Sequence, residues 1–328
     1  MYDVTVIGPA IIDVLASPVD LQAPVGKTRD LERIRMSFGG DALNESVVLT
    51  RLGKKVQLIS KVGDDAAGNN VLSFLRDNHV GTDYVKAEKG LETAVNIAMI
   101  DQTGQRLFLM NPHSSLRKLG LPDVEEQLDK NRTAGIVCFA SLFISPLFTA
   151  GDLKVLFSRI RSEGRTLVVD MTRPKNGEKL EDLKELLPYI DVFIPNDEEV
   201  CALTGDPDPV RNARRLAEAG VGTAVVKTGG DGCIVASKEE TVLVPSVPGV
   251  HCVDTTGAGD TFAAGFLAGL CDGLPAAMCA RLGCAAASCS IEEIGATDGV
   301  RSLDQVMERM KKIPENRRKQ TGGSITKN

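Results

Sequence analysis

Tryptophan is absent from the 328 residues, and aromatic residues make up only 4% of them. Lysine and arginine number 38 against 44 aspartate and glutamate, which gives a formal net charge of −6. A mildly acidic chain with few aromatic residues lacks the basic patches and stacking side chains that bind nucleic acids, so we expect no nucleic-acid partner. No run of 18 or more uncharged apolar residues occurs, so we expect no membrane-spanning helix and no membrane partner.

The eight cysteines form no Cys-x-x-Cys pair and mostly stand in apolar surroundings, which favours reduced core thiols over disulfides or zinc ligands. The three histidines, at positions 79, 113 and 251, have neither the spacing of a metal site nor that of a catalytic triad. The N-terminal sequence carries no basic region and is typical of a first strand rather than of a signal peptide. We therefore expect a cytoplasmic protein.

Short apolar runs alternate with helix-like segments along most of the chain, which predicts an α/β fold with a parallel sheet between two helical layers. The expected strands are residues 4–7, 56–61, 135–139, 166–170, 192–194 and 224–228. The expected helices are one that ends at residue 52, one that begins at residue 260, and residues 68–78, 153–162, 180–187, 198–204, 210–219 and 276–290. Residues 93–100 and 106–110 are typical of a hairpin, whereas 14–38 do not predict a helix.

The most informative stretch is Asp254-Thr-Thr-Gly257-Ala-Gly259-Asp260-Thr-Phe262. Its two glycines allow a tight turn and close approach of a ligand, and the apolar residues after Asp260 recur at helical spacing. The unpaired amides and the dipole at a helix start bind anions, and a carboxylate beside them indicates a base next to a transferring phosphoryl group. The alternative is that Asp260 only favours the helix start and the glycines only turn the chain.

Two other phosphate-binding motifs do not occur. No Gly-x-x-x-x-Gly-Lys-Ser/Thr sequence is present, and Phe262 occupies the third glycine position of a dinucleotide fingerprint. We expect Gly259 to tolerate no side chain, because a Cβ atom would intrude on the phosphate oxygens and would disfavour a positive φ.

The same stretch resembles the C-terminal signature of the ribokinase-like (phosphofructokinase B) carbohydrate kinases. This resemblance implies a central, mostly parallel sheet flanked by helices on both faces, with a small β lid over the sugar. It implies that Asp260 is the base that takes the proton from the sugar hydroxyl, and that the amides of Gly257, Ala258 and Gly259 hold the transferring phosphate. It also implies ATP and Mg²⁺ as cofactors and a small sugar as substrate.

The resemblance covers nearly the whole chain and implies the following division. Residues 1–13, 39–92 and 111–314 form the main nucleotide- and sugar-binding domain, and residues 14–38 and 93–110 form the lid. A homodimer through the lid is consistent with this arrangement. The tail, 315–328, is polar and basic, so we expect it to be disordered.

Asp13 follows the first strand, and Phe38-Gly39-Gly40-Asp41-Ala-Leu-Asn44 opens a helix. The family resemblance implies that Asp13, Gly39, Gly40 and Asn44 bind the sugar hydroxyls, since a carboxylate and an amide hydrogen-bond vicinal hydroxyls well. Alternatively, the glycine pair is only a turn. Arg173 lies in a turn that resembles one of fructokinases and ketodeoxygluconate kinases. It would reach a phosphate or a substrate carboxylate, or pair with a surface acid.

The nucleotide would bind through two further segments. Asn196 to Glu199 resembles the Asn-x-x-Glu motif that steers magnesium and phosphate, although it is also a capping box, and both roles are compatible. Thr228, Gly230 and Gly232 resemble the nucleotide-phosphate loop, for which an ordinary hairpin turn is the alternative.

Two weaker assignments come from the same resemblance. Ala285 stands in a run of small residues that would pack against adenine, or would only allow close packing of a helix on the sheet. Asp254 and Thr256 match positions that hold a monovalent cation such as K⁺ in ribokinases, so we expect them to bind one.

Together these motifs predict an ATP-dependent sugar kinase that phosphorylates a hydroxymethyl group. A nucleoside kinase of the same fold is an alternative, but the lid offers Phe108 and little else to grip a base. A 2-keto-3-deoxygluconate-type kinase is favoured by Asp41 and Arg173, yet Asn111 stands where those kinases carry a lid arginine, so we predict a neutral ketohexose or pentose. A sugar-sensing regulator without turnover is disfavoured by the intact motif at Asp260.

Overall fold

The computed structural model describes residues 2–20, 30–103, 105–130, 134–319 and 325–326. Their largest element is an 11-stranded sheet in the order β15-β14-β13-β12-β11-β10-β9-β8-β1-β4-β5. In this spatial order, the neighbours from β11 to β5 pair in parallel, and the neighbours from β15 to β11 pair antiparallel. The bounds are β1 Val4–Ile7, β4 Val56–Gly63, β5 Val85–Glu88, β8 Ile136–Leu142, β9 Thr166–Met171, β10 Val192–Phe193, β11 Thr223–Lys227, β12 Cys233–Ala236, β13 Thr241–Val244, β14 Arg317–Lys319 and β15 Ile325–Thr326.

The parallel strands are apolar because both faces of the sheet are covered. All four residues of β1 and all eight of β4 are buried, and neighbouring side chains enter opposite layers. Val6 belongs to the core on one face and Ile7 to the core on the other. The predicted mostly parallel sheet with helices on both faces is confirmed.

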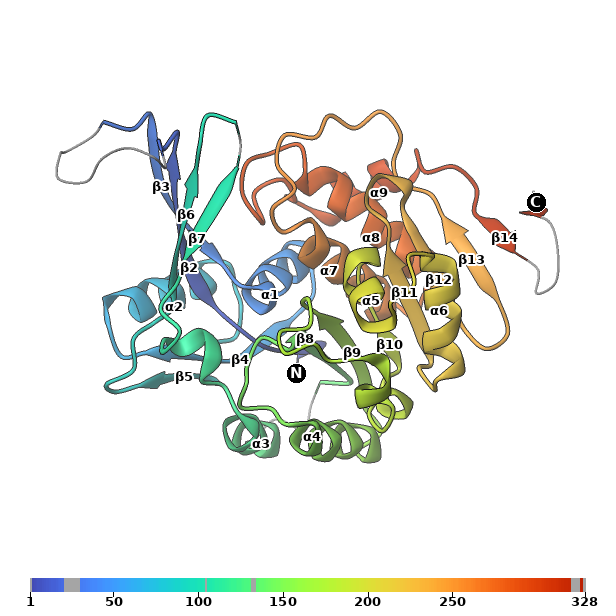
Figure 1. Ribbon diagram of the computed structural model, residues 1–328, viewed down its shortest axis with the longest axis horizontal. Coiled ribbons are helices and arrows are strands. Elements are labelled where there is room, and N and C mark those ends of the chain that lie inside the picture. Colours follow the sequence, from blue (N-terminus) through green and yellow to red (C-terminus); the bar gives the residue numbers. More distant parts are fainter. Residues whose placement is uncertain (1, 21–29, 104, 131–133, 320–324, 327–328) are drawn as a thin grey trace.

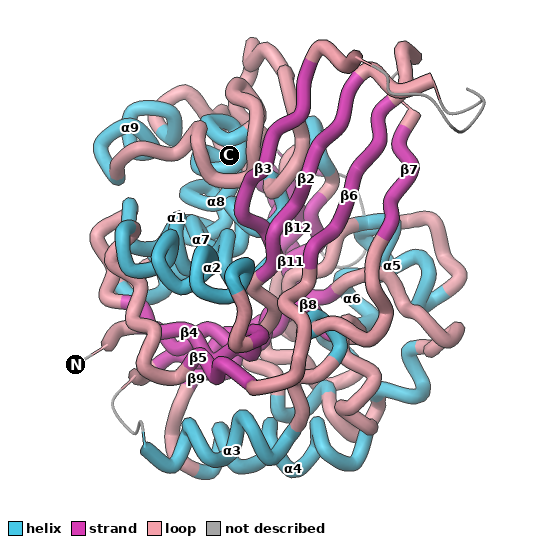
Figure 2. Tube along the Cα trace, turned by 90° about the vertical axis from the view of Figure 1, so that its left-hand side faces the viewer, coloured by secondary structure: helices cyan, strands magenta, loops and turns pink. Residues whose placement is uncertain are grey.

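The helices form one layer on each side of this sheet, as Figure 2 shows edge-on. One layer contains α1 Asp41–Arg51, α2 Ala66–Asp77, α7 Ala258–Cys271, α8 Ala276–Ser290 and α9 Leu303–Met310. The other contains α3 Leu121–Lys130, α4 Ala150–Ser162, α5 Asp197–Thr204 and α6 Pro209–Glu218. Short 3₁₀ turns occur at Ser115–Arg117, Leu180–Leu183, Leu187–Tyr189 and Gly229–Asp231.

The continuous helix expected over 180–187 is wrong. The chain forms two short 3₁₀ turns there, and the second contains Pro188. Proline lacks an amide proton and disfavours the helical conformation of the residue before it, so the apolar periodicity of this segment is not enough to sustain an α-helix.

Four strands form a separate sheet in the order β3-β2-β6-β7, which projects from the main body at the upper left of Figure 1. They are β2 Ile11–Ser17, β3 Arg33–Gly39, β6 Val95–Ile100 and β7 Arg106–Leu109, and β6 and β7 make the predicted hairpin. This sheet contains the strands expected to form the lid. Its strand β2 begins at Ile11, before the expected boundary at residue 14, so Asp13 lies on a lid strand. Residues 21–29 of the expected lid lie outside the described residues.

The tail expected to be disordered is described only in part. Arg317–Lys319 (β14) pairs with β13, and Ile325–Thr326 (β15) pairs with β14. Residues 320–324 and 327–328 lie outside the described part of the chain. No helix within the described residues is long and apolar enough to cross a membrane.

Helix α7 is fixed in place by its close contact with α8, and two glycines make that contact possible. A Cβ atom on Gly265 would lie 2.8 Å from the carbonyl oxygen of Leu282, and one on Gly283 would lie 2.8 Å from that of Phe262. The first turn of α7 is thereby held near the carboxyl ends of β9, β10 and β11, the edge where open α/β sheets bind ligands.

Candidate active site

Gly257 is the N-cap residue of α7, and its left-handed φ of 71° turns the chain from the preceding loop into the helix. A Cβ atom here would lie 2.6 Å from the carbonyl oxygen of Ala296, so both the backbone conformation and the space require glycine. Gly259 lies inside the helix, and the part of the expectation that gave it a positive φ is wrong. The tight turn predicted from the two glycines is made by Gly257 alone.

A cavity of about 830 Å³ opens in front of this turn. Ala258 and Gly259 line it from α7, Asn196 from the start of α5, and Gly230 and Gly232 from the loop after β11. Its other wall is largely apolar and includes Val247, Val250, Phe262, Cys284, Ala287 and Ile291. A helix start next to an apolar wall forms a site suited to a phosphate attached to a flat apolar group.

Three of the predicted nucleotide residues, Glu199, Thr228 and Ala285, do not line this cavity. Ala285 is fully buried, and its neighbours on α8, Cys284 and Ser288, face the cavity instead. The amide of Thr228 donates to the carbonyl of Gly232 at 2.9 Å, so Thr228 closes the turn that carries the lining glycines. Their roles as nucleotide contacts remain predictions.

Asp260 is the third residue of α7 and hydrogen-bonds a side chain from the opposite helix. The amide nitrogen Nδ2 of Asn44, on α1, donates to Oδ2 of Asp260 at 2.7 Å. Burial is the main cause that raises the pKa of Asp260 to about 8, with a further contribution from the carboxylate of Asp41. The hydrogen bond from Asn44 acts in the opposite direction. A carboxyl group with this pKa is well suited to accept a proton near neutral pH.

The chain contains a second Ala-Gly-Asp sequence at the same helical positions, and it behaves differently. Ala150, Gly151 and Asp152 open α4 as Ala258, Gly259 and Asp260 open α7. Asp152 is partly exposed and forms a capping box with Thr149, whose hydrogen bonds lower the pKa of its carboxyl group. The unusual pKa at α7 therefore comes from the surroundings of the tripeptide.

Four of the five residues predicted to bind the sugar come together around the start of α1, and one of them, Asn44, contacts Asp260. Asp13 comes from β2, Gly39 ends β3, and Gly40 with a φ of 93° precedes α1, which carries Asn44. A Cβ atom on Gly39 would lie 2.0 Å from Oδ2 of Asp13, and one on Gly40 would lie 2.6 Å from the carbonyl oxygen of Pro9. Gly40 is therefore required by its backbone conformation and by the backbone of Pro9, whereas a side chain at Gly39 would displace the carboxylate of Asp13.

Sequence reasoning missed two polar contacts of this region. Asn96 on β6 pairs with Asp13 on β2, and its hydrogen bond counteracts the burial that raises the pKa of Asp13. Asp41 accepts a hydrogen bond from Ser141, which has a left-handed φ of 66°. A strained non-glycine residue beside a functional region is typical of binding sites. An asparagine inside the apolar run 95–100 was the available signal for the first contact.

The largest omission is the ion pair between Lys227 and Asp170, at the carboxyl ends of β11 and β9. Nζ of Lys227 lies 2.8 Å and 3.0 Å from the two carboxylate oxygens, and the side chains are only 12% and 6% exposed. Burial opposes the charge of the ammonium group, but the carboxylates of Asp170 and Glu199 outweigh it and raise the pKa of Lys227. A lysine that ends a buried strand and precedes a glycine-rich turn could have been recognised from the sequence.

Asn196 and Glu199 form the capping box that was the alternative to a ligand site. Oδ1 of Asn196 accepts from the amide of Glu199 at 2.8 Å, and Oε2 of Glu199 accepts from the amide of Asn196 at 2.7 Å. Burial raises the pKa of Glu199 to about 7. A capping box leaves carboxylate lone pairs free, so it is compatible with water-mediated binding of Mg²⁺.

The remaining predicted residues are placed as follows. Arg173 is exposed after β9. Oδ1 of Asp254 accepts from the amide and hydroxyl of Thr256 at 3.0 Å and 2.7 Å, and Oδ2 accepts from the amide of Gly295 at 3.1 Å. Among the described residues, no cluster of three or more His, Cys, Asp or Glu side chains could hold a metal ion. Cation binding at Asp254 and Thr256 remains a prediction.

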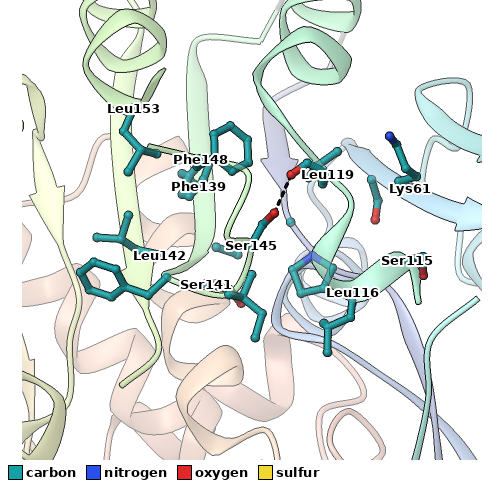
Figure 3. Close-up of a pocket in the computed structure, with 16 residues that line it drawn as sticks. Lys61, Ser115, Leu116, Leu119, Phe139, Ser141, Leu142, Ser145, Phe148 and Leu153 are labelled. Atoms are coloured by element: carbon teal, nitrogen blue, oxygen red, sulfur yellow. Dashed lines mark hydrogen bonds between the residues drawn. The ribbon is translucent and has the colours of Figure 1, made fainter. Parts of the chain in front are cut away.

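A second cavity, shown in Figure 3, lies between β8, the turn at Ser115–Arg117 and the loop after β8. The hydroxyl of Ser145 donates to the carbonyl oxygen of Leu119 at 2.7 Å across it. Its volume of about 30 Å³ has room for one or two water molecules and none for a sugar.

The chain matches the model of the pfkB family of carbohydrate kinases over residues 1–303. It is 32% identical over 262 residues to an Archaeoglobus fulgidus protein described as an uncharacterized sugar kinase. The match covers 78% of this chain and 99% of that protein. The structure superposes on Arabidopsis thaliana ribokinase complexed with ribose and ATP, with a TM-score of 0.81, 23% identity and coverage of 94% and 99%. It also superposes on an E. coli protein provisionally assigned as ribokinase II, in complex with ATP and Mg²⁺, with a TM-score of 0.80 and 23% identity. This match covers 95% of this chain and 99% of that protein. The ribokinase-like fold is confirmed.

Gly259→Val tests the space in front of the helix amides. A Cβ atom at this position would lie 3.4 Å from Nζ of Lys227, so the valine methyl groups would occupy the place of an anion. We expect loss of turnover by about a hundredfold or more, because the amides can no longer approach developing charge. ADP release in the presence of ATP and an acceptor measures this effect.

Gly151→Val is the matched control, because Gly151 has the same position in α4 and only the hydroxyl of Thr149, at 3.6 Å, near its Cβ direction. It should keep full turnover. If Gly259→Val is as active as this control, the glycine serves the turn alone.

Proposed function

This chain belongs to the pfkB family of carbohydrate kinases, and we propose that it transfers the γ-phosphoryl group of ATP to a hydroxymethyl group of a small neutral sugar. Membership makes it a phosphotransferase that acts on an alcohol group. The observation that carries the finer proposal is the position of Asp260, between the amides of the α7 turn and the group around Asp13, with its pKa raised to about 8.

The proposed reaction follows from this position. Asp260 accepts the proton of the sugar hydroxyl as its oxygen attacks the γ-phosphorus, and the bridging oxygen leaves with ADP. The amides of Gly257, Ala258 and Gly259 stabilise the charge on the transferring group. Asn44 orients Asp260, and Asp13 with the backbone at Gly39 and Gly40 holds the acceptor.

We propose that the 830 Å³ cavity binds the nucleotide. Asn196, Glu199 and the loop from Thr228 to Gly232 would hold the phosphates, and α8 near Ala285 would support the base. Mg²⁺ bound to the nucleotide would shield the phosphate charges. The donors fit this ion, since it usually keeps several waters and needs only one or two carboxylates besides phosphate oxygens. K⁺ at Asp254 and Thr256 is part of the same proposal.

The acidity of the site supports a neutral acceptor. Asp13, Asp41 and Asp260 carry carboxyl groups there, and a substrate carboxylate would be repelled by those of them that are ionised. Asn111, at the lid position considered for a cation, donates to Glu92 and accepts from the amide of His113 at 2.8 Å. Neither contact supplies positive charge, and Arg173 is exposed.

Two wider proposals concern the whole molecule. The lid strands expose the apolar side chains Ile34, Met36, Leu107, Phe108 and Leu109, which would be covered in a homodimer formed through the lid.

The eight cysteines are free thiols, which supports a reducing, cytoplasmic environment.

Asp260→Asn tests the general base. The amide keeps the size of the side chain but cannot accept a proton, so we expect kcat to fall by on the order of a hundredfold or more. KM for the acceptor should change little. Asp152→Asn, at the same helical position in α4, should leave kcat unchanged while lowering stability by about 1 kcal/mol through the weaker cap. An Asp260→Asn enzyme that keeps most of its kcat contradicts the assignment.

The pH dependence follows from the pKa of Asp260. Because the base acts only when deprotonated, kcat/KM should rise with pH up to about pH 8. Asp41→Asn removes a carboxylate that raises this pKa, so the acidic limb of the profile should move to lower pH. A limb that stays in place or moves to higher pH argues against this electrostatic coupling.

The acceptor is tested by kcat/KM for fructose and ribose against 2-keto-3-deoxygluconate, with nucleosides in the same panel. We expect the best neutral sugar to exceed the acid by at least about tenfold, since an unpaired charged group costs on the order of 1.5 kcal/mol or more. A clear preference for the acid would show that Arg173 reaches the substrate, and a preference for nucleosides would favour the alternative kinase.

A further inference from the structure

Lys227 borders both the nucleotide cavity and the first turn of α7. It ends strand β11 and lines the cavity next to Asn196, with which it forms an isolated parallel bridge. Its Nζ lies 3.4 Å from where a Cβ atom on Gly259 would stand. The ammonium group is therefore in van der Waals range of the helix turn whose amides we assign to the transferring phosphoryl group.

Two positive features converge at this point, the amides at the start of α7 and the ammonium group of Lys227. The start of a helix carries a partial positive charge, so a buried ammonium group beside it is unfavourable unless negative charge lies nearby. Asp170 and Glu199 supply that negative charge to Lys227. An anion in front of the turn would be attracted by the amides and the ammonium group together.

The hydrogen-bonding capacity of Lys227 leaves room for such an anion. An ammonium group has three donors, and the described hydrogen bonds of Nζ are the two to the carboxylate of Asp170. One donor remains for a ligand oxygen. Asp170 is itself buried and also receives the amide of Met171 at 2.8 Å, so its carboxylate is held in a fixed orientation.

We propose that Lys227 is a catalytic residue whose ammonium group contacts an oxygen of the transferring phosphoryl group, and that Asp170 is its positioning residue. This inference rests on the proposed function. As the acceptor oxygen bonds to the γ-phosphorus and loses its proton to Asp260, the bond from the phosphorus to the bridging oxygen breaks and its electrons leave with ADP. Lys227 stays protonated throughout and stabilises the equatorial charge.

Lys227→Met is the principal variant, because methionine keeps an unbranched chain without the charge. We expect kcat to fall by about a hundredfold or more, while the Kd for ADP and the KM for the acceptor stay within about threefold. ADP with fluoroaluminate mimics the transferring phosphoryl group, so the wild type should bind it more tightly than ADP and Lys227→Met should not. Lys154→Met is the matched control. Lys154 is an exposed residue on α4, and this change removes its ion pair with Glu185.

Removal of Lys227 alone leaves the carboxylate of Asp170 buried without its partner, so a double variant is needed. Lys227→Met with Asp170→Asn removes both charges and provides the same comparison if the single variant does not fold. If the ion pair is only structural, the double variant should regain activity to within about threefold of the wild type. If the ammonium group is catalytic, the folded double variant should be as slow as Lys227→Met.

Asp170→Asn alone tests the positioning role. The ammonium group remains but is less well fixed, so kcat should fall by about tenfold with ADP affinity unchanged. In the Lys227→Met background the same change should have no further effect, because a positioning residue acts only through its partner. Additive losses would contradict this role.

Two results would overturn the proposal for Lys227: recovery of activity in the double variant, or an equal loss of affinity for ADP alone and for ADP with fluoroaluminate in Lys227→Met. The second result would make Lys227 an anchor for the nucleotide. Failure of the proposed function is distinguishable, because a wild type that phosphorylates no sugar can still be compared with the variants in fluoroaluminate binding and in ADP release with water as acceptor.

Discussion

The ion pair between Lys227 and Asp170 sets the charge balance at the carboxyl edge of the sheet. The carboxylates of Asp41 and Asp170 raise the pKa of Asp260, and the ammonium group of Lys227 lowers it. The pKa of Glu199 is likewise raised by the carboxylates of Asp170 and Asp41 and lowered by the ammonium group of Lys227. Because these groups lie in a region of low polarity, each charge affects its neighbours far more than it would in water, and the site holds several acidic groups only with a cation among them.

The fold brings these groups together by its topology. Parallel strands place their carboxyl ends at one edge, so Asp170 near the end of β9, Asn196 after β10 and Lys227 at the end of β11 become neighbours although the chain separates them widely. The glycines that let α7 approach α8 hold the helix start at this edge, and Gly39 with Gly40 connects the lid to α1. Close packing of backbone against backbone thus fixes the distances on which the chemistry depends.

Much of the fold and part of the site could be predicted from the sequence. The alternation of apolar runs and helices gives the sheet, and the sequence from Asp254 to Phe262 identifies the helix start and Asp260. The ion pair of Lys227 could not be found in this way, because its partner Asp170 is 57 positions away and only the pairing of β9, β10 and β11 joins them. Periodicity also predicted a helix that Pro188 interrupts.

The two Ala-Gly-Asp sequences show why the tripeptide alone is insufficient: the residue before it, Thr149 or Gly257, and the tertiary surroundings distinguish Asp152 from Asp260. The central claim is that these surroundings give Asp260 an unusual pKa, and it can be measured directly. A ¹³C NMR titration of the aspartate carboxyl groups, assigned with Asp260→Asn and Asp152→Asn, should show Asp260 titrating at about 8 and Asp152 below the ordinary range of aspartate. If both titrate together near the ordinary value of about 4, the account of this site is contradicted.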